Sequence, residues 1–139
     1  MEENVTFQSD GLTLSAVVHT PDDLKPGERR PAVMVLHGFG SKKVSNNCTG
    51  PCKMLTEWGY ITMRFDFRGC GESEGEYGRL ICLEQVSDTS NALSYLQSRD
   101  DVDPDRIGAL GSSFGAAVAV YTGGVDERVA AVISSGGWG

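Results

Sequence analysis

The chain has 139 residues, of which 40% are hydrophobic and 22% charged, and its formal net charge is −7. These values are typical of one globular domain, and the acidic balance argues against a nucleic-acid partner, because phosphate binding needs a basic surface. The basic pairs Arg29-Arg30 and Lys42-Lys43 are interpreted as solvated loop ends. No apolar run approaches the roughly 18 residues of a membrane span, and the acidic start does not resemble a secretory signal. We therefore expect no membrane association and a cytoplasmic location.

The first 20 residues predict an antiparallel hairpin. Apolar and polar residues alternate at positions 5–8 and 12–18, as in a strand. The Asp10-Gly11 pair between these segments is typical of a tight turn. A polar segment bounded by Pro21 and Pro31 predicts a surface loop. Four short apolar runs further along have the pattern of strands buried on both faces of a sheet. They lie at residues 32–36, 61–65, 106–110 and 128–133.

Three helices are predicted between these strands. The first of these helices is predicted at residues 51–58, with Pro51 in its first turn and Gly59 just after its end. Proline is favoured at the start of a helix and glycine just beyond its end. Residues 82–98 carry an apolar stripe at helical spacing, and residues 114–121 are apolar almost all round. Because strands and helices alternate, we expect an α/β fold: a mostly parallel sheet with helices on both faces, entered through the N-terminal antiparallel hairpin.

Four cysteines are present, and they do not form a recognisable metal site. Cys48 and Cys52 are four residues apart, but no histidine or second cysteine pair completes a zinc pattern. With Cys70 and Cys82 they are interpreted as reduced thiols. We expect no metal and no cofactor.

The segment Gly111-Ser112-Ser113-Phe114-Gly115 has the spacing G-x-S-x-G and lies between a predicted strand and a predicted helix. In this context the motif predicts a sharp turn that holds the central serine at the sheet edge with strained backbone angles. Glycine is needed at 111 and 115 because side chains there would collide. Ser113 is therefore the candidate nucleophile, and Ser112 is excluded because no glycine pair flanks it. The amide of Phe114 lies at the helix N-terminus, where partial positive charge favours a developing oxyanion.

Further motifs occur in a fixed order around this turn. They are His37-Gly38-Phe39-Gly40 after the strand at 32–36, a D-x-R-G-x-G-x-S loop within residues 64–75, and Asp103-Pro104-Asp105-Arg106-Ile107 before the turn. In these motifs the sequence resembles the α/β-hydrolase superfamily, in particular its serine esterase and serine aminopeptidase-like branch. The resemblance extends over about residues 5–135 and is highly specific for the fold.

The resemblance implies a serine hydrolase of carboxylic esters or small amides that forms an acyl-enzyme at Ser113. In such proteins the loop at 37–40 supplies a second oxyanion-hole amide, so Phe39 joins Phe114 as a donor, and His37 makes structural hydrogen bonds. Arg68 and Ser73 are expected to fix their loop rather than bind substrate. An aminopeptidase or acyl-peptidase acting on small peptides is the alternative within the same fold, and a non-catalytic fragment or interaction module is the alternative outside it.

The sequence departs from the family at one point. In the family the catalytic serine is followed along the chain by the acid of the triad and then by the histidine. After Ser113 this sequence has two acidic residues, Asp126 and Glu127, and no histidine. We expect both carboxylates on the far side of the sheet. Residues 1–139 are therefore interpreted as the N-terminal part of a single, truncated α/β-hydrolase domain, which lacks further strands, any cap domain and the rest of the triad. Alone it is expected to be nearly inactive, with a small-molecule ester or amide as its partner and its oligomeric state undetermined.

Overall fold

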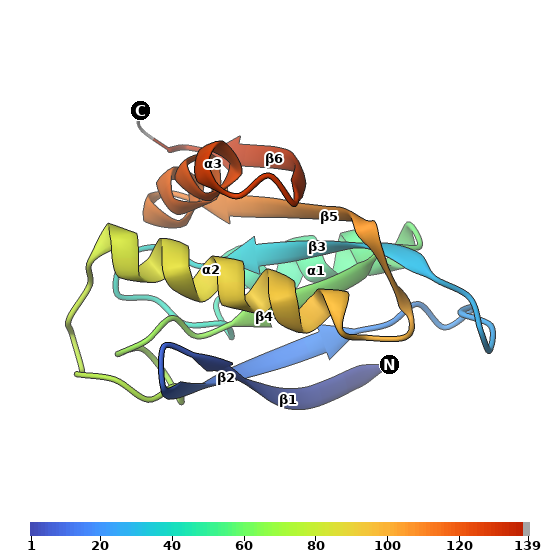
Figure 1. Ribbon diagram of the computed structural model, residues 1–139, viewed down its shortest axis with the longest axis horizontal. Helices are drawn as coiled ribbons and strands as arrows, with labels where there is room; N and C mark the ends of the chain where they lie inside the picture. Colours follow the sequence, from blue (N-terminus) through green and yellow to red (C-terminus); the bar gives the residue numbers. More distant parts are fainter. Residues whose placement is uncertain (138–139) are drawn as a thin grey trace.

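A computed structural model describes residues 1–137 and shows one six-stranded sheet with three helices (Figure 1). The elements in chain order are β1 (Glu2–Ser9), β2 (Leu12–His19), β3 (Arg30–Leu36), α1 (Asn46–Glu57), β4 (Ile61–Phe65), α2 (Cys82–Gln97), β5 (Val102–Ser112), α3 (Phe114–Val125) and β6 (Val129–Ser135). The strand order is β1-β2-β4-β3-β5-β6. The last two residues of the predicted single domain, 138 and 139, lie outside the described residues.

The N-terminal hairpin is formed as predicted. Asp10 and Gly11 both have positive φ angles, 49° and 83°, which is the conformation of a two-residue turn between Ser9 and Leu12. β2 then pairs antiparallel with β4, whereas β4, β3, β5 and β6 are mutually parallel. The expectation of a mostly parallel sheet with an antiparallel entry is confirmed.

Helices cover both faces of the sheet, because the parallel strands are apolar on both sides. α2 and α3 pack on one face, where alternate residues of β3 such as Met34 and Leu36 join the larger core. α1 packs on the other face, where Cys48 and Cys52 contact a smaller core that includes Val35. The cysteines of α1 therefore fill space beneath the sheet, and burial raises their pKa values to about 11 and about 12, so they stay protonated thiols.

The start of α1 differs from the prediction, which placed it at Pro51. The helix begins five residues earlier, at Asn46, because the N–H groups of Cys48 and Thr49 already donate to the carbonyl of Ser45. Pro51 lies in the second turn, where it removes one helical hydrogen bond only. The predicted end is confirmed, because Gly59 adopts a φ of 99° just beyond the helix.

The parallel arrangement brings several loops to one edge of the sheet. The carboxyl ends of β3, β4 and β5 lie at this edge, so the loops that follow Leu36, Phe65 and Ser112 become neighbours. This edge is where an open α/β sheet places its functional residues. Within residues 1–137 no helix is long and apolar enough to cross a membrane.

β6 forms an open edge of the sheet in the described part of the chain. It pairs with β5 on one side only, and its residues Val132 and Ile133 are 37% and 52% exposed. An exposed apolar edge strand is a template for association. We predict that the purified 139-residue polypeptide self-associates in sedimentation velocity and that Ile133→Lys reduces this association. Ile81→Lys, at an exposed isoleucine just before α2, should not reduce it. A monodisperse monomer would contradict the prediction.

Candidate active site

Ser113 occupies a tight turn between β5 and α3. Its φ of 54° and ψ of −122° lie in a region that residues other than glycine seldom adopt. Its N–H donates to the carbonyl of Ser135 in β6 at 3.0 Å, and its carbonyl accepts from the N–H of Ala116 at 3.0 Å. The strained conformation is therefore held by β6 on one side and by the first turn of α3 on the other.

The two glycines of the motif allow two separate close approaches. A Cβ atom at Gly111 would collide with the carbonyl of Gly115 across the turn. A Cβ atom at Gly115 would instead lie 2.5 Å and 2.6 Å from the carbonyl oxygens of His37 and Leu36. Gly111 is thus required by the turn itself, as the sequence predicts, whereas Gly115 is required because α3 starts directly against the end of β3.

The turn presents the side chain of Ser113 and buries that of its neighbour. Ser113 is exposed, whereas the hydroxyl of Ser112 is buried and has no hydrogen-bond partner within residues 1–137. A Cβ atom built on Gly38 would lie 3.5 Å from Cβ and 4.0 Å from Oγ of Ser113. Gly38 therefore lies beside the Ser113 hydroxyl and leaves room next to it.

The loop after β3 packs against the residue that follows Ser113. The N–H of Ser41 donates to the carbonyl of Gly38 at 3.1 Å, which closes a turn with Gly40 at a φ of 65°. The ring of Phe39 meets the ring of Phe114 edge to face, with centroids 5.7 Å apart. Phe114 is also the first residue of α3, at the positive end of the helix dipole. The structure thus brings Phe39, Phe114 and Ser113, all three candidate residues, into one place.

His37 is buried close to Ser113 but both of its ring nitrogens are occupied. Nε2 accepts from the N–H of Phe67 at 3.1 Å, and Nδ1 lies 2.8 Å from the carbonyl of Gly38. Because a carbonyl only accepts, Nδ1 carries the proton and the ring is neutral. Burial lowers the pKa of His37, which agrees with this tautomer. His37 therefore connects the loops after β3 and β4.

The second histidine, His19, and the carboxylates that follow Ser113 in the chain lie at the opposite edge of the sheet. His19 pairs with Thr62 at the start of β4, and its Nε2 accepts from Nε of Arg64 at 3.0 Å. Asp126 caps the far end of α3, and Arg128 binds its carboxylate at 2.7 Å. This agrees with the expectation that Asp126 and Glu127 lie away from the serine.

The loop after β4 is organised by Asp66, a buried carboxylate whose role the sequence analysis did not predict. Asp66 accepts from the N–H and the ammonium group of Lys43, both at 2.7 Å, and from the N–H of Glu72 at 3.0 Å. A Cβ atom at Gly71 would overlap this carboxylate. The interpretation of Lys43 as a solvated loop end is wrong: it is 4% exposed. Burial alone would lower the pKa of Lys43, but the hydrogen bonds that its ammonium group donates to Asp66 and Glu72 raise it.

Arg68 and Ser73 fix the same loop. Arg68 bonds to the fully buried carboxylate of Asp88 in α2 through Nε at 3.0 Å and Nη2 at 2.8 Å. Ser73 donates to the carbonyl of Asp66 at 2.6 Å and accepts from the N–H of Ser15 at 2.9 Å. Asp88 was not anticipated, because an aspartate within an amphipathic helix gives no sign of being buried.

The strained serine at the carboxyl edge of a parallel sheet, preceded by a hairpin, defines an α/β hydrolase. Solved structures agree: a protein of Pseudomonas aeruginosa, PA2218, superposes with a TM-score of 0.91 at 28% identity, over 99% of this chain and 43% of that chain. The α/β hydrolase GrgF from Penicillium sp. sh18 gives a TM-score of 0.87 at 27% identity, over 95% and 44% of the two chains. Residues 10–139 match the model of the X-Pro dipeptidyl-peptidase (S15) family, and the chain belongs to this family.

Curated relatives are longer than this chain. The quorum-quenching protein AidA of Acinetobacter baumannii is 32% identical over 132 residues, which are 94% of this chain and 42% of AidA. The acyltransferase drtE of Aspergillus calidoustus is 32% identical over 138 residues, 98% of this chain and 43% of that protein. The chain thus spans less than half the length of these relatives.

The close approach at Gly115 can be tested within one helix. Gly115→Ala should destabilise the protein by about 1–3 kcal/mol or more, because the added methyl group meets the carbonyl oxygens of Leu36 and His37. Gly124→Ala in the same helix meets no atom within 4 Å and should be neutral or stabilising by up to about 1 kcal/mol. Urea unfolding of both variants measures the difference, and equal effects would show that the approach does not constrain the fold.

The neutral histidines predict a dependence of stability on pH. The pKa values of His37 and His19 are lowered from 6.5, first by burial and, for His19, also by the charge of Arg64. The unfolded chain then binds more protons than the folded chain below pH 6.5, so the free energy of unfolding should fall as the pH drops from about 7.5 to about 5.5. Urea unfolding at the two pH values measures this. In His19→Gln the free energy of unfolding should still decrease at the lower pH, by the part that His37 contributes. A free energy of unfolding that is unchanged or higher at the lower pH would contradict the assignment of neutral histidines.

Proposed function

We propose that Ser113 is the nucleophile of a serine hydrolase that acts on carboxylic esters or small amides. The observation that carries this proposal is an exposed hydroxyl on a non-glycine residue with positive φ, held at the start of α3 beside Gly38. A backbone in such a conformation costs about 1–3 kcal/mol and is found mainly where function requires it. An ordinary glycine-rich turn would place a glycine at this position.

The proposed reaction follows from the arrangement around Ser113. Its Oγ attacks the carbonyl carbon of the substrate, and the electron pair of the C=O bond moves to the oxygen. The amides of Phe39 and Phe114 donate to this oxyanion, and each such donor typically contributes about 10²–10³ in rate. The leaving group departs as the carbonyl re-forms, which leaves an acyl-enzyme that water hydrolyses.

The proton of Ser113 needs an acceptor, which we place outside residues 1–139. His37 is committed to two backbone partners, and His19 lies at the opposite edge of the sheet. A histidine and a carboxylate from elsewhere would complete the triad. Without them the serine hydroxyl stays protonated and is a weak nucleophile.

Action on small peptides is the second candidate function. It is favoured by the matched family, which is described as X-Pro dipeptidyl-peptidase, and by a 32% identical segment of human dipeptidyl peptidase 8, which covers 81% of this chain and 14% of that protein. The acyltransferase drtE favours acyl esters instead. The exposed ring of Phe39 offers an apolar contact to either substrate.

A fluorophosphonate probe tests the nucleophile directly. The sample is the protein expressed from its complete open reading frame. We expect the probe to modify Ser113, and mass spectrometry locates the modified residue. Ser113→Ala should abolish the modification, whereas Ser112→Ala should keep it, because the Ser112 hydroxyl is buried. Modification of another residue, or none, would contradict the proposal.

The same protein and the 139-residue polypeptide should differ in the hydrolysis of a p-nitrophenyl ester. Without a triad, substrate binding and an oxyanion hole accelerate hydrolysis only about 10³–10⁴-fold over the uncatalysed reaction. The 139-residue polypeptide should show at most this acceleration. Rapid turnover by the 139-residue polypeptide that Ser113→Ala abolishes would show that the base lies within these residues.

A further inference from the structure

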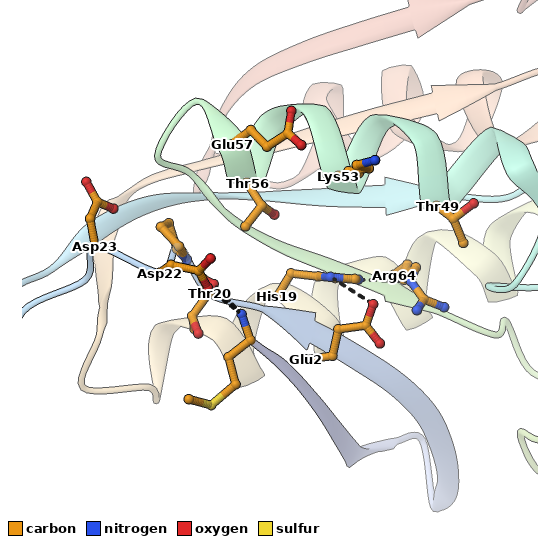
Figure 2. Close-up of a pocket in the computed structure, with 12 residues that line it drawn as sticks. Glu2, His19, Thr20, Asp22, Asp23, Thr49, Lys53, Thr56, Glu57 and Arg64 are labelled. Carbon is orange, nitrogen blue, oxygen red and sulfur yellow. Dashed lines mark hydrogen bonds and ion pairs between the residues drawn. The ribbon is translucent and has the colours of Figure 1, made fainter.

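A cavity of about 630 Å³ opens on the α1 side of the sheet (Figure 2), and Ser113 is not among the residues that line it. It starts at the sheet edge where β4 begins and lies between α1 and the β1–β2 hairpin. α1 packs mainly over β3 and β4, so this side of the hairpin is left open in the described part of the chain. The volume is within the range of about 300–1,000 Å³ that is typical of small-molecule sites.

Arg64 in β4 lines this cavity and carries an unpaired charge. Arg64 is only 6% exposed. Its Nε donates to Nε2 of His19 at 3.0 Å, and its Nη1 donates to the carbonyl of Lys43 at 3.1 Å. Both acceptors are neutral. The carboxylate of Asp66 is paired with Lys43 at 2.7 Å, and that of Glu2 lies 3.6 Å from Nδ1 of the neutral His19. No salt bridge to Arg64 occurs within residues 1–137. A nearly buried cation is usually paired with an anion.

Other donors gather at the same end of the cavity as Arg64. Lys53 and Thr49 are four residues apart on α1 and therefore share one face of the helix, and Figure 2 shows both beside the cavity above Arg64. The ammonium group of Lys53 has no salt bridge within the described residues. Nδ1 of His19 carries a proton, because Nε2 accepts from Arg64.

Carboxylates are concentrated at the other end of the cavity. Asp22, Asp23 and Glu57 lie there, whereas Glu2 is the carboxylate beside Arg64 and His19 (Figure 2). Asp22 and Asp23 are each 3.4 Å from a cation, the N-terminal ammonium and Arg30. Arg64 and Lys53, in contrast, form no salt bridge within the described residues.

We propose that the basic end of this cavity binds the oxyanion of a small molecule, a carboxylate or a phosphate, with Arg64 and Lys53 as its counterions. The guanidinium offers directional donors to such a group and the ammonium adds a second positive charge. This site is independent of Ser113 and of the proposed hydrolysis.

Equilibrium dialysis with radiolabelled inorganic phosphate tests the proposal at constant ionic strength, with acetate as a competitor. We expect saturable binding of one phosphate per chain or, if the site prefers a carboxylate, of one labelled acetate. Lys53→Met should weaken binding about two- to fivefold, as expected for loss of one exposed charge. Arg64→Gln should weaken it at least as much, and Glu2→Gln should strengthen it.

Lys25→Met is the matched control, because Lys25 is an exposed lysine that does not line the cavity. It should leave the affinity unchanged. Lys53 and Glu2 are exposed, so their variants test the site even if Arg64→Gln fails to fold. Absence of saturable binding of both anions, or equal effects of Lys53→Met and Lys25→Met, would overturn the proposal.

Discussion

The start of α3 approaches the end of β3 so closely at Gly115 that no side chain fits between them. A single methyl group there would meet the carbonyl oxygens of Leu36 and His37. This contact fixes the position of the helix N-terminus relative to the loop that leaves β3. Ser113, one residue before the helix, consequently lies against Gly38, one residue beyond that contact.

Buried polar side chains anchor the loops around Ser113. His37 connects the ends of β3 and β4 through its two ring nitrogens, and Asp66 connects the loop after β4 to Lys43. Removing one partner of such a buried ion pair typically costs about 3–5 kcal/mol, because the other charge is left unpaired. The edge of the sheet that carries Ser113 is therefore rigid for reasons that do not involve the serine itself.

Local patterns in the sequence were sufficient to predict the elements whose structure is decided locally. Both ends of the strand at 61–65 agree with the prediction. All five of its residues are buried, on one face of the sheet or the other, which gives a continuous apolar pattern. The turn at 111–115 was predicted because glycine spacing, a strand before it and an apolar helix after it act within a few residues. The first turn of α1 was missed, because Asn46, Asn47 and Gly50 are weak helix formers and packing of Cys48 under the sheet decides the outcome.

Contacts between distant segments could not be predicted in the same way. Lys43 and Asp66 are 23 residues apart, and Arg68 and Asp88 are 20 apart. Their pairing depends on which loops the strand order brings together, and a charged residue in a polar loop normally points to solvent. The sequence could locate the turn that carries Ser113, but not the buried charges that hold the surrounding loops.

We propose that the Ser113 turn holds an oxyanion between the backbone amides of Phe39 and Phe114. A crystal structure of the protein phosphonylated at Ser113 tests it most directly, because the phosphoryl oxygen stands in for the tetrahedral oxyanion. We expect this oxygen to lie about 2.7–3.1 Å from the amide nitrogens of Phe39 and Phe114, with Ser113 still at positive φ. A phosphoryl oxygen that points away from both amides would contradict it.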